Sequence, residues 1–483
     1  MEFTRLGTLK TAEDFRDCIR ALDGRVDSDL KLLGSDGPLG QSVNILKPNG
    51  EALTASNRFC VHPMEGWDAG LDGTPSEHTV RRWQRFGESG AALVWGCEAF
   101  AVQRDGKANP SQLYYESKDQ ASDSLRQLLD ALRASAGDIQ QIVGLQLTHS
   151  GRFSRPDGPM APLIAEQNKP LAKKYGLDES VHTLTDDELQ AIRDRMIEVA
   201  KIAAEVGFDF VDVKACHGYL LHELFGAHTR EGKYGGPFEN RTRLFREVVE
   251  GIKSECPELA IGCRVSITDM VPFVADEESN RGVPLDLDDH LPWMHGFGVN
   301  PSNPLESQWD EPVRFLQDAM ELGVGTFNLT VGSPYYCPHF QRPAAYPPSD
   351  GYLPPRDPLH EVIRHILTVR EIKSRVPEAV LVGSGYSYLQ GWLPYLAQAE
   401  VRSGHVDFVG LGRSTLAYHD MPAKVLSGQE LEKKKFCRTL SDCTTGPRNG
   451  MISGCFPLDP YYMKMPEAKT VREIRSAATK QRK

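Results

Sequence analysis

Short apolar runs alternate with helical segments along most of this 483-residue chain. Eight such runs occur, and amphipathic helices are predicted between them. Eight alternating strand and helix units favour an α/β fold in which a parallel sheet closes into a TIM (β/α)8 barrel rather than an open sheet. The predicted strands cover residues 58–62, 91–97, 140–147, 208–213, 259–265, 325–331, 379–383 and 406–411. The predicted helices cover residues 76–89, 120–135, 185–205, 240–254, 311–322, 358–375 and 388–401.

The barrel is predicted to occupy residues 51–430, between two segments of different composition. Residues 1–50 are expected to form an N-terminal extension that packs on the barrel or plugs it. Residues 431–483 are expected to form a short C-terminal tail that contains cysteines and whose last fifteen residues are frayed. Segment 333–358, rich in Pro and aromatic residues, is long enough to favour a functional loop over the site.

The charge balance argues against two classes of partner. The chain has 55 Lys and Arg against 66 Asp and Glu, whereas nucleic acid or an anionic membrane would favour clustered basic residues. Its start lacks the apolar core of a signal peptide, and no apolar stretch reaches the length that spans a bilayer, so a cytoplasmic protein is expected. The 10 cysteines do not indicate a disulfide framework over this length. Assembly into a homo-oligomer is left open.

One predicted strand leads directly into three side chains that can handle protons. Lys214, His217 and Tyr219 follow the apolar run 208–213. Because ligands bind at the carboxyl ends of parallel strands in such folds, the position of these residues indicates a reaction site. The alternative for Tyr219 is a core aromatic residue whose hydroxyl is satisfied.

Polar residues or glycines also follow the other predicted strands. Apolar layers fill a barrel interior, so polar residues collected at one rim indicate a ligand site. Glycines after strands seven and eight, with Arg413, are typical of a phosphate site. The alternatives are tight turns alone, or a dinucleotide fingerprint in which Tyr388 takes the third glycine position. The strand-end residues are Pro63, Met64, Glu65, Glu98, Ala99, Gln146, His149, Arg264, Asn328, Thr330, Gly383, Gly385, Gly410 and Gly412.

Seven segments, in order, resemble the old yellow enzyme family of FMN-dependent oxidoreductases. They are NRFCVHPM, LVWGCEAFAV, GLQLTHSGR, the block from VKACHGYL to YGGPFENR, GCRVS, VGSG and DFVGLGR. The resemblance covers about residues 45–420 and is greatest to the barrel of the branch that contains dienoyl-CoA reductase and trimethylamine dehydrogenase. It implies that NAD(P)H reduces a bound FMN, which passes hydride to an activated C=C bond or another electron-poor acceptor.

The resemblance also implies how the flavin is held. Arg264 would face the N1–C2 carbonyl locus, where negative charge develops in the reduced flavin. The other residues implied at the cofactor are Pro63, Met64 and Ala99 along the ring, Gln146 at its pyrimidine edge, and Gly385, Gly412 and Arg413 at the phosphate.

Two residues at the implied substrate site depart from the family pattern. In the family, the residues at the positions of Lys214 and His217 bind the substrate carbonyl, and the tyrosine at the position of Tyr219 donates a proton. The first position is usually His or Asn, and the position of Glu65 usually holds Cys or Thr. We expect Lys214, His217 and Glu65 to contact the substrate, and a Lys214–Glu65 ion pair is a hypothesis.

The tail cysteines resemble part of a cluster site. Relatives place four iron–sulfur ligands as C-x2-C-x3-C-x11-C after the barrel. Cys443 and Cys455 keep the last spacing, Cys437 is out of register by one, and Thr439 and Phe436 occupy the other two positions. No metal is the favoured interpretation, and an iron–sulfur cluster or zinc at the three cysteines stays open.

Two other functions stay open. Electrons would flow in the opposite direction in an amine or other substrate dehydrogenase that passes them to an external redox partner. A barrel that binds FMN without catalysis is the third possibility, and the presence of His217, Tyr219 and Arg264 argues against it.

Overall fold

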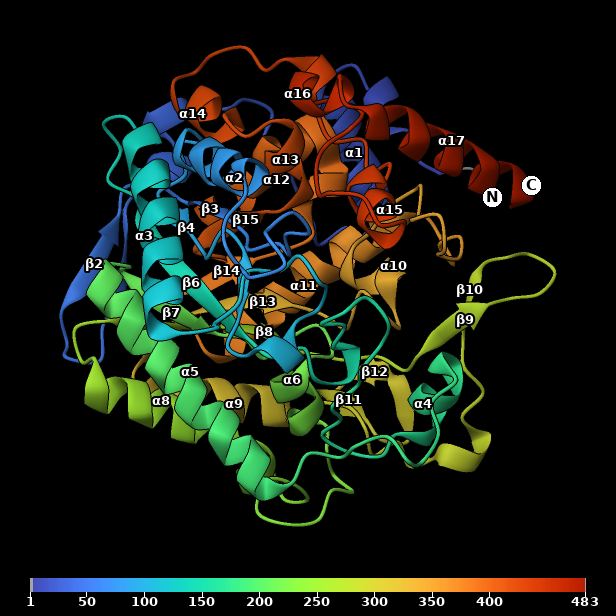
Figure 1. Ribbon diagram of the computed structural model, residues 1–483. Helices are drawn as coiled ribbons and strands as arrows, with labels where there is room; N and C mark the ends of the chain where they lie inside the picture. Colours follow the sequence, from blue (N-terminus) through green and yellow to red (C-terminus); the bar gives the residue numbers. More distant parts are fainter. Residues whose placement is uncertain (1–2, 483) are drawn as a thin grey trace.

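The computed structural model describes residues 3–482 (Figure 1). Residues 1, 2 and 483, which belong to the predicted extension and tail, lie outside the described residues. Within the described part of the chain, no helix combines the length and the apolar character needed to cross a bilayer.

A closed parallel barrel forms the centre of the molecule, which confirms the predicted fold class. The sheet order is β4-β3-β15-β14-β13-β8-β7-β6-β5, and pairing of β4 with β6 closes the ring. The second barrel position is divided into two short strands because the backbone turns at Gly96 and Cys97, whose φ angles are 151° and 43°. The strands are β3 (Phe59–Val61), β4 (Leu93–Val94), β5 (Ala99–Ala101), β6 (Ile142–Thr148), β7 (Phe210–Val213), β8 (Ala260–Ser266), β13 (Val324–Thr330), β14 (Leu381–Gly383) and β15 (Phe408–Leu411).

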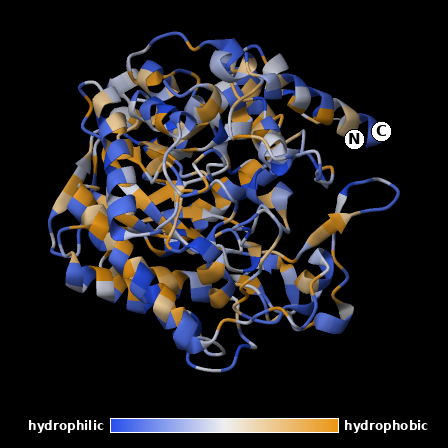
Figure 2. Ribbon diagram, viewed as in Figure 1, coloured by the Kyte–Doolittle hydropathy of each residue, from blue (hydrophilic) through white to orange (hydrophobic). Residues whose placement is uncertain are grey.

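Helices surround the barrel, and their apolar residues recur along the inner side (Figure 2). The predicted helix at 388–401 differs, because it starts as a 3-10 segment at Tyr386–Trp392 and is broken at Gln390, whose φ is 54°. The predicted helix at 240–254 is likewise divided in two. The surrounding helices are α2 (Glu77–Gly87), α3 (Lys118–Ser135), α5 (Asp186–Val206), α7 (Phe238–Arg241), α8 (Arg243–Glu255), α9 (Asp310–Leu322), α11 (Pro358–Arg375) and α12 (Leu393–Arg402).

Alternation along β7 carries side chains from the barrel core up to its rim. Phe210, Asp212 and Lys214 are two residues apart and therefore point to the same side of the strand. Phe210 packs in the apolar cluster at the amino end of the barrel, where a Cβ at Gly144 would lie 2.3 Å from its ring. Lys214 thus reaches the carboxyl end, above the apolar layers.

The N-terminal segment closes the amino end of the barrel. Helix α1 (Ala12–Leu22) is followed by a hairpin of β1 (Val43–Leu46) and β2 (Ala52–Ala55). Ile45 and Ala55 of this hairpin are buried in the same cluster as Phe210. The hairpin spans residues 50 and 51, and the division into 1–50, 51–430 and 431–483 stays a prediction.

Short elements form the rest of the carboxyl face. The long connections contain α4 (Lys169–Tyr175), α6 (Leu220–Phe225), α10 (Pro338–Gln341) and the hairpins of β9 (Phe273–Ala275) with β10 (Gly282–Pro284) and β11 (Val299–Asn300) with β12 (Asn303–Ser307). The chain then continues through α13 (Arg413–Ala417), α14 (Met421–Leu426), α15 (Asp442–Arg448), α16 (Pro460–Met463) and α17 (Pro466–Gln481).

The expectation of a frayed chain end is wrong for residues 469–482. Most of them belong to α17, in which Val471 is buried. At the helix end, Arg482 donates hydrogen bonds to the carbonyl oxygens of Pro348, Ser349 and Gly351. The charged side chains therefore tie the tail to the 333–358 loop instead of keeping it in solvent.

Candidate functional site

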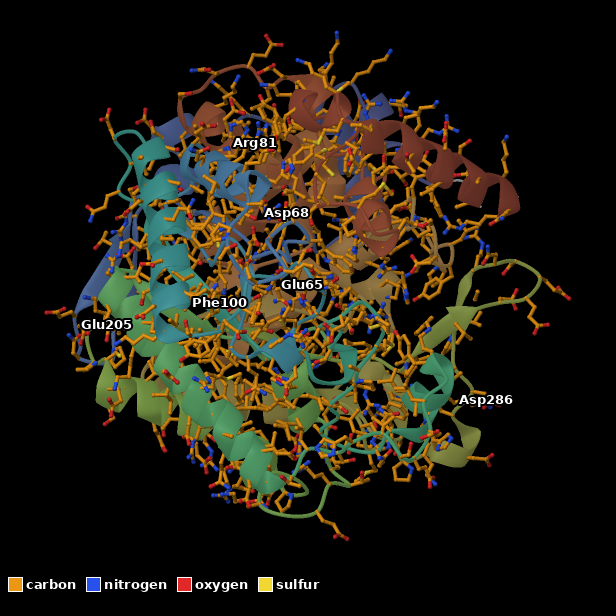
Figure 3. The ribbon with its side chains drawn as sticks, in the orientation of Figure 1. Glu65, Asp68, Arg81, Phe100, Glu205 and Asp286 are labelled. Atoms are coloured by element: carbon orange, nitrogen blue, oxygen red, sulfur yellow. The ribbon has the colours of Figure 1, made fainter. Side chains whose placement is uncertain are left out.

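A cavity of about 260 Å³ opens at the carboxyl end of the barrel. Figure 3 places Glu65 and Asp68 near the centre of the molecule, within the ring of helices. The cavity brings together residues from the ends of β3, β6, β7, β8, β14 and β15. The predicted site residues that line it are Pro63, Met64, Glu65, Gln146, Lys214, His217, Arg264, Gly385, Gly412 and Arg413.

Two predicted site residues lie behind the wall. Ala99 is buried, and its backbone N–H donates to the carbonyl oxygen of Met64 at 3.2 Å. Tyr219 is 1% exposed, and its hydroxyl is hydrogen-bonded to Glu65 and to the hydroxyl of Tyr335. Both residues therefore support groups that face the cavity.

The hypothesised Lys214–Glu65 ion pair is present in the structure. Lys214 Nζ lies 3.4 Å from Glu65 Oε1 and 4.0 Å from the centre of the Tyr219 ring. The same Glu65 oxygen accepts a hydrogen bond from the Tyr219 hydroxyl. Burial and the Glu65 carboxylate raise the pKa of Tyr219 well above its usual value, so its hydroxyl keeps its proton.

His217 is held in a constrained backbone conformation as a neutral imidazole. Its φ is 69°, its N–H donates to Ser266 Oγ at 3.0 Å, and its carbonyl oxygen accepts from Ser333 Oγ at 2.6 Å. Gln341 Nε2 lies 3.1 Å from His217 Nε2. Burial, with the charges of Arg264 and Lys214, lowers the pKa of His217 well below its usual value. A neutral imidazole at this position can donate a hydrogen bond without giving up a proton.

Arg264 and Gln146 are oriented by one buried carboxylate. Asp212 accepts hydrogen bonds from Gln146 Nε2 at 2.6 Å, from Trp95 Nε1 at 2.7 Å and from the backbone N–H of Arg264 at 2.6 Å. The Arg264 guanidinium donates to the carbonyl oxygen of Pro63 at 3.1 Å, while its Nε is buried without a partner. The cavity wall therefore presents a fixed cation with unused hydrogen-bonding capacity.

A second cationic group also lines the cavity. Arg413 donates to the carbonyl oxygen of Pro343 at 2.9 Å, and its NH1 is buried without a partner. Arg342 also lines the cavity and donates to Thr444 Oγ1 at 2.7 Å. Burial and the charge of Arg413 lower the pKa of Arg342 to about 10. A Cβ at Gly412 would have its nearest neighbour 3.9 Å away, so the backbone there borders open space.

Several cavity residues were missed by reasoning from the sequence. His62 follows β3 directly and is held by Asn328 at 3.0 Å and Ser384 at 3.1 Å, so its position at a strand end was a usable signal. Tyr335, Gln341 and Arg342 come from the 333–358 loop, and Cys443, Thr444, Pro447, Arg448 and Ser453 come from the tail. Only the length and aromatic content of the loop indicated that it covers the site.

The tail does not fit an iron–sulfur cluster. Among the side chains that the structure describes, no three from His, Cys, Asp or Glu are grouped so that they could hold a metal ion. Cys437, Cys443 and Cys455 have free thiols, and Phe436 and Thr439 stand where the cluster pattern needs cysteines.

A larger groove of about 1560 Å³ lies between the N-terminal extension and the segment after α14. It is lined by residues such as Leu6, Trp392 and Phe436, and it does not contain the strand-end residues of the barrel. We place the candidate site in the smaller cavity because the polar strand ends converge there.

Known proteins resemble this chain in sequence. Residues 50–279 match the model of the NADH:flavin oxidoreductase / NADH oxidase family. An NADPH dehydrogenase of Listeria monocytogenes is 30% identical over 253 residues, which covers 51% of this chain and 68% of that protein. An NADH:flavin oxidoreductase of Gibberella zeae is 29% identical over 239 residues, and the match covers 46% of this chain and 56% of the relative.

Solved structures share the fold. Morphinone reductase superposes with a TM-score of 0.53 at 19% identity, covering 84% of this chain and 96% of the other. Histamine dehydrogenase from Rhizobium sp. 4-9 gives a TM-score of 0.62 at 21% identity and covers 89% of this chain. This chain spans only 53% of that protein. The predicted resemblance to the old yellow enzyme family is confirmed by these matches, and the chain belongs to the NADH:flavin oxidoreductase / NADH oxidase family.

Proposed function

We propose that this protein is an FMN-dependent NAD(P)H oxidoreductase that reduces an activated C=C bond or another electron-poor acceptor. The observation that carries the proposal is the convergence of Arg264, Gln146, Lys214 and His217 on one cavity that Arg413 also lines. Family membership supports the same conclusion.

The residues present fit FMN. The unpartnered Nε of Arg264 and NH1 of Arg413 supply two cationic donors in the cavity, and Gly412 leaves open space beside Arg413. Arg264 would face the N1–C2 carbonyl locus of the flavin. The Gln146 Nε2 group already donates a hydrogen bond to Asp212, so Gln146 would offer its carbonyl oxygen to the pyrimidine edge. Pro63 and Met64 would border the ring, with Ala99 behind them.

At the phosphate end, Gly385, Gly412 and Arg413 would be joined by Arg342. Two neighbouring guanidinium groups repel each other in a buried site unless an anion lies between them. A phosphate dianion meets that requirement and suits the planar donor fork of arginine.

When bound, FMN supplies the hydride chemistry that no side chain can provide. Lys214 and His217 would bind the acceptor carbonyl, on which negative charge develops as hydride adds to the β-carbon. Tyr219 would supply the proton that reaches the α-carbon, because its hydroxyl stays protonated. Glu65 would hold Lys214 and Tyr219 in place and contact the substrate. An external redox partner and a homo-oligomer stay predictions.

Replacing Arg342 with Met is expected to weaken FMN binding by roughly 10- to 100-fold, the range for a lost hydrogen bond to a charged group. Riboflavin, which has no phosphate, should bind the variant as it binds the wild type. Quenching of flavin fluorescence by the flavin-free protein measures both affinities. Arg364→Met is a matched control, since Arg364 donates to Leu305 and does not line the cavity. Equal losses of affinity for FMN and for riboflavin would show that Arg342 does not bind the phosphate.

Replacing Lys214 with Met is expected to lower the midpoint potential of the bound flavin by roughly 30 mV, a tenfold change in a two-electron equilibrium. The reason is that Glu65 would then face the flavin without a cation. Anaerobic equilibration with a reference dye measures the potential. Lys174→Met is the control, because Lys174 donates to the carbonyl oxygen of Phe273 away from the cavity. An unchanged potential in Lys214→Met would exclude this electrostatic role.

The function is tested by adding candidate reductants to the FMN-bound protein without oxygen. NADH or NADPH should bleach the yellow flavin absorbance, whereas histamine or trimethylamine should not. Bleaching by an amine and not by either nicotinamide would favour the dehydrogenase alternative. A purified protein that is colourless and does not take up FMN would contradict both.

A further inference from the structure

Tyr335 lines the cavity and is hydrogen-bonded to Tyr219. The hydroxyl groups of Tyr219 and Tyr335 are 2.7 Å apart. Tyr219 is 1% exposed and does not line the cavity, whereas Tyr335 is half-buried and does. A substrate in the cavity would therefore meet the hydroxyl of Tyr335 before that of Tyr219.

The position of Tyr335 is fixed by its surroundings. Its ring stacks on Phe153, with centroids 4.1 Å apart and an interplanar angle of 9°. Its N–H donates to Ser333 Oγ at 3.2 Å, and the same Ser333 hydroxyl donates to the carbonyl oxygen of His217. The hydroxyl of Tyr175 donates to the Tyr335 carbonyl oxygen at 2.8 Å. These contacts therefore fix the position of Tyr335 relative to His217, the residue implied to bind the substrate carbonyl.

A chain of proton-carrying groups leads from Tyr335 back to a charged pair. Tyr219 is hydrogen-bonded to both Tyr335 and Glu65, and Glu65 is paired with the ammonium group of Lys214 at 3.4 Å. The Glu65 side chain is 20% exposed and the Lys214 side chain only 2%, so Glu65 is the member of the pair that reaches solvent. Phenol, carboxylate and ammonium groups in hydrogen-bonded series can pass a proton from one to the next.

We propose that Tyr335 gives the proton to the substrate, and that Tyr219 restores it from the Glu65–Lys214 pair. The proposal rests on alkene reduction being the function. The O–H bond of Tyr335 breaks and the α-carbon gains that proton, while the electron pair for the new C–H bond comes from the former C=C bond after hydride has reached the β-carbon. Tyr335 then takes the proton of Tyr219, and Tyr219 takes one from Glu65. Water restores the proton through Glu65.

The order of the groups gives Tyr219 a role different from that of a direct donor. With the Tyr219 hydroxyl donating to the Glu65 carboxylate, Tyr335 donates to Tyr219 and the series points away from the cavity. A proton placed on Glu65 reverses both hydrogen bonds, and the Tyr335 hydroxyl then points to the cavity. Both tyrosines must be present for transfer, so their removal has effects that do not add.

The test compares Tyr335→Phe, Tyr219→Phe and the double variant in their FMN-bound forms. In each variant, the rates of flavin reduction by NADPH and of reoxidation by ferricyanide should change far less than the rate of reoxidation by an enone, because neither of the first two steps protonates carbon. Reoxidation by 2-cyclohexen-1-one should fall by at least about 100-fold in each single variant, and the double variant should lose little more. Tyr352→Phe is the matched control, since Tyr352 lies in the same loop and its hydroxyl contacts His339. A wild-type enone rate in Tyr335→Phe, with a large loss in Tyr219→Phe, would overturn the proposal.

A second measurement does not depend on turnover. In FMN-bound protein labelled with [ζ-13C]tyrosine, Tyr335→Phe should shift the Tyr219 resonance, and Tyr352→Phe should not. An unshifted Tyr219 resonance would show that the hydroxyls of Tyr219 and Tyr335 are not hydrogen-bonded, and it would overturn the proposed proton relay. If the wild type takes hydride from NADPH but passes none to the enone, the proposed function fails and the donor role falls with it, even where the resonance shift is present.

Discussion

His217→Ala should reoxidise its flavin with 2-cyclohexen-1-one about 100- to 1,000-fold more slowly than the wild type, the cost of losing one donor to a developing oxyanion. The structure gives the physical reason. His217 lines the cavity, and burial with the charges of Arg264 and Lys214 lowers its pKa and keeps it neutral. It therefore acts by donating a hydrogen bond to the carbonyl oxygen, while the proton for carbon comes from the tyrosines. Stopped-flow absorbance of the flavin under anaerobic conditions measures the rate.

Two comparisons separate this role from a structural one. Ferricyanide takes electrons without a carbonyl contact, so its rate should be unchanged in His217→Ala. His217→Asn should recover a large part of the enone rate, because asparagine supplies an N–H donor and tolerates the φ of 69° better than alanine does. If Ala and Asn variants lose the enone rate equally, backbone geometry rather than the donor explains the effect.

Arg264→Met is expected to weaken FMN binding by roughly 10- to 100-fold and to lower the midpoint potential of any flavin that stays bound. Arg264 is 6% exposed, and its Nε has no partner in the described structure. Removing the guanidinium takes away the cation at the implied N1–C2 carbonyl locus, so the reduced flavin loses more stabilisation than the oxidised one. Fluorescence titration gives the affinity, and dye equilibration gives the potential.

Arg58→Met is the control for a generally weakened barrel. Arg58 precedes β3 at the amino end of the barrel and donates to the carbonyl oxygens of Gln41, Ser42 and Asp407. Its loss should lower thermal stability while leaving FMN affinity and potential unchanged. Arg264→Lys should lower the midpoint potential of the flavin less than Arg264→Met does, because lysine keeps the charge but not the planar donor fork. Wild-type affinity and potential in Arg264→Met would contradict the flavin orientation proposed here.

The barrel could be predicted from the sequence because buried parallel strands are short apolar runs separated by helices of regular period. The division of the second strand could not. It depends on the close approach of Gly96 to Gln146, where a Cβ would lie 2.9 Å from the Gln146 backbone nitrogen, and no local pattern records such a contact. The charges of the tail are typical of a frayed end, yet the Arg482 guanidinium donates to loop carbonyl oxygens that lie more than 130 residues away in sequence.

Residues at strand ends were identified in advance because a parallel barrel brings every carboxyl end to one rim. Ten residues predicted to contact the cofactor or the substrate line the cavity for that reason. Tyr335 and Arg342 were missed, since a long loop has no periodicity to indicate which side chains point inward. The buried position of Tyr219 could not be predicted either, because it depends on contacts with Glu65 and Tyr335, which are distant in sequence.

In the proposed function, hydride passes from NAD(P)H through bound FMN to an activated alkene. The measurement that tests this transfer is anaerobic titration of the FMN-bound protein with NADPH, followed by one equivalent of 2-cyclohexen-1-one. The flavin absorbance should bleach, return on addition of the enone, and leave one cyclohexanone for each flavin. Flavin that stays bleached in the presence of the enone, or recovers without forming cyclohexanone, would contradict the proposed function.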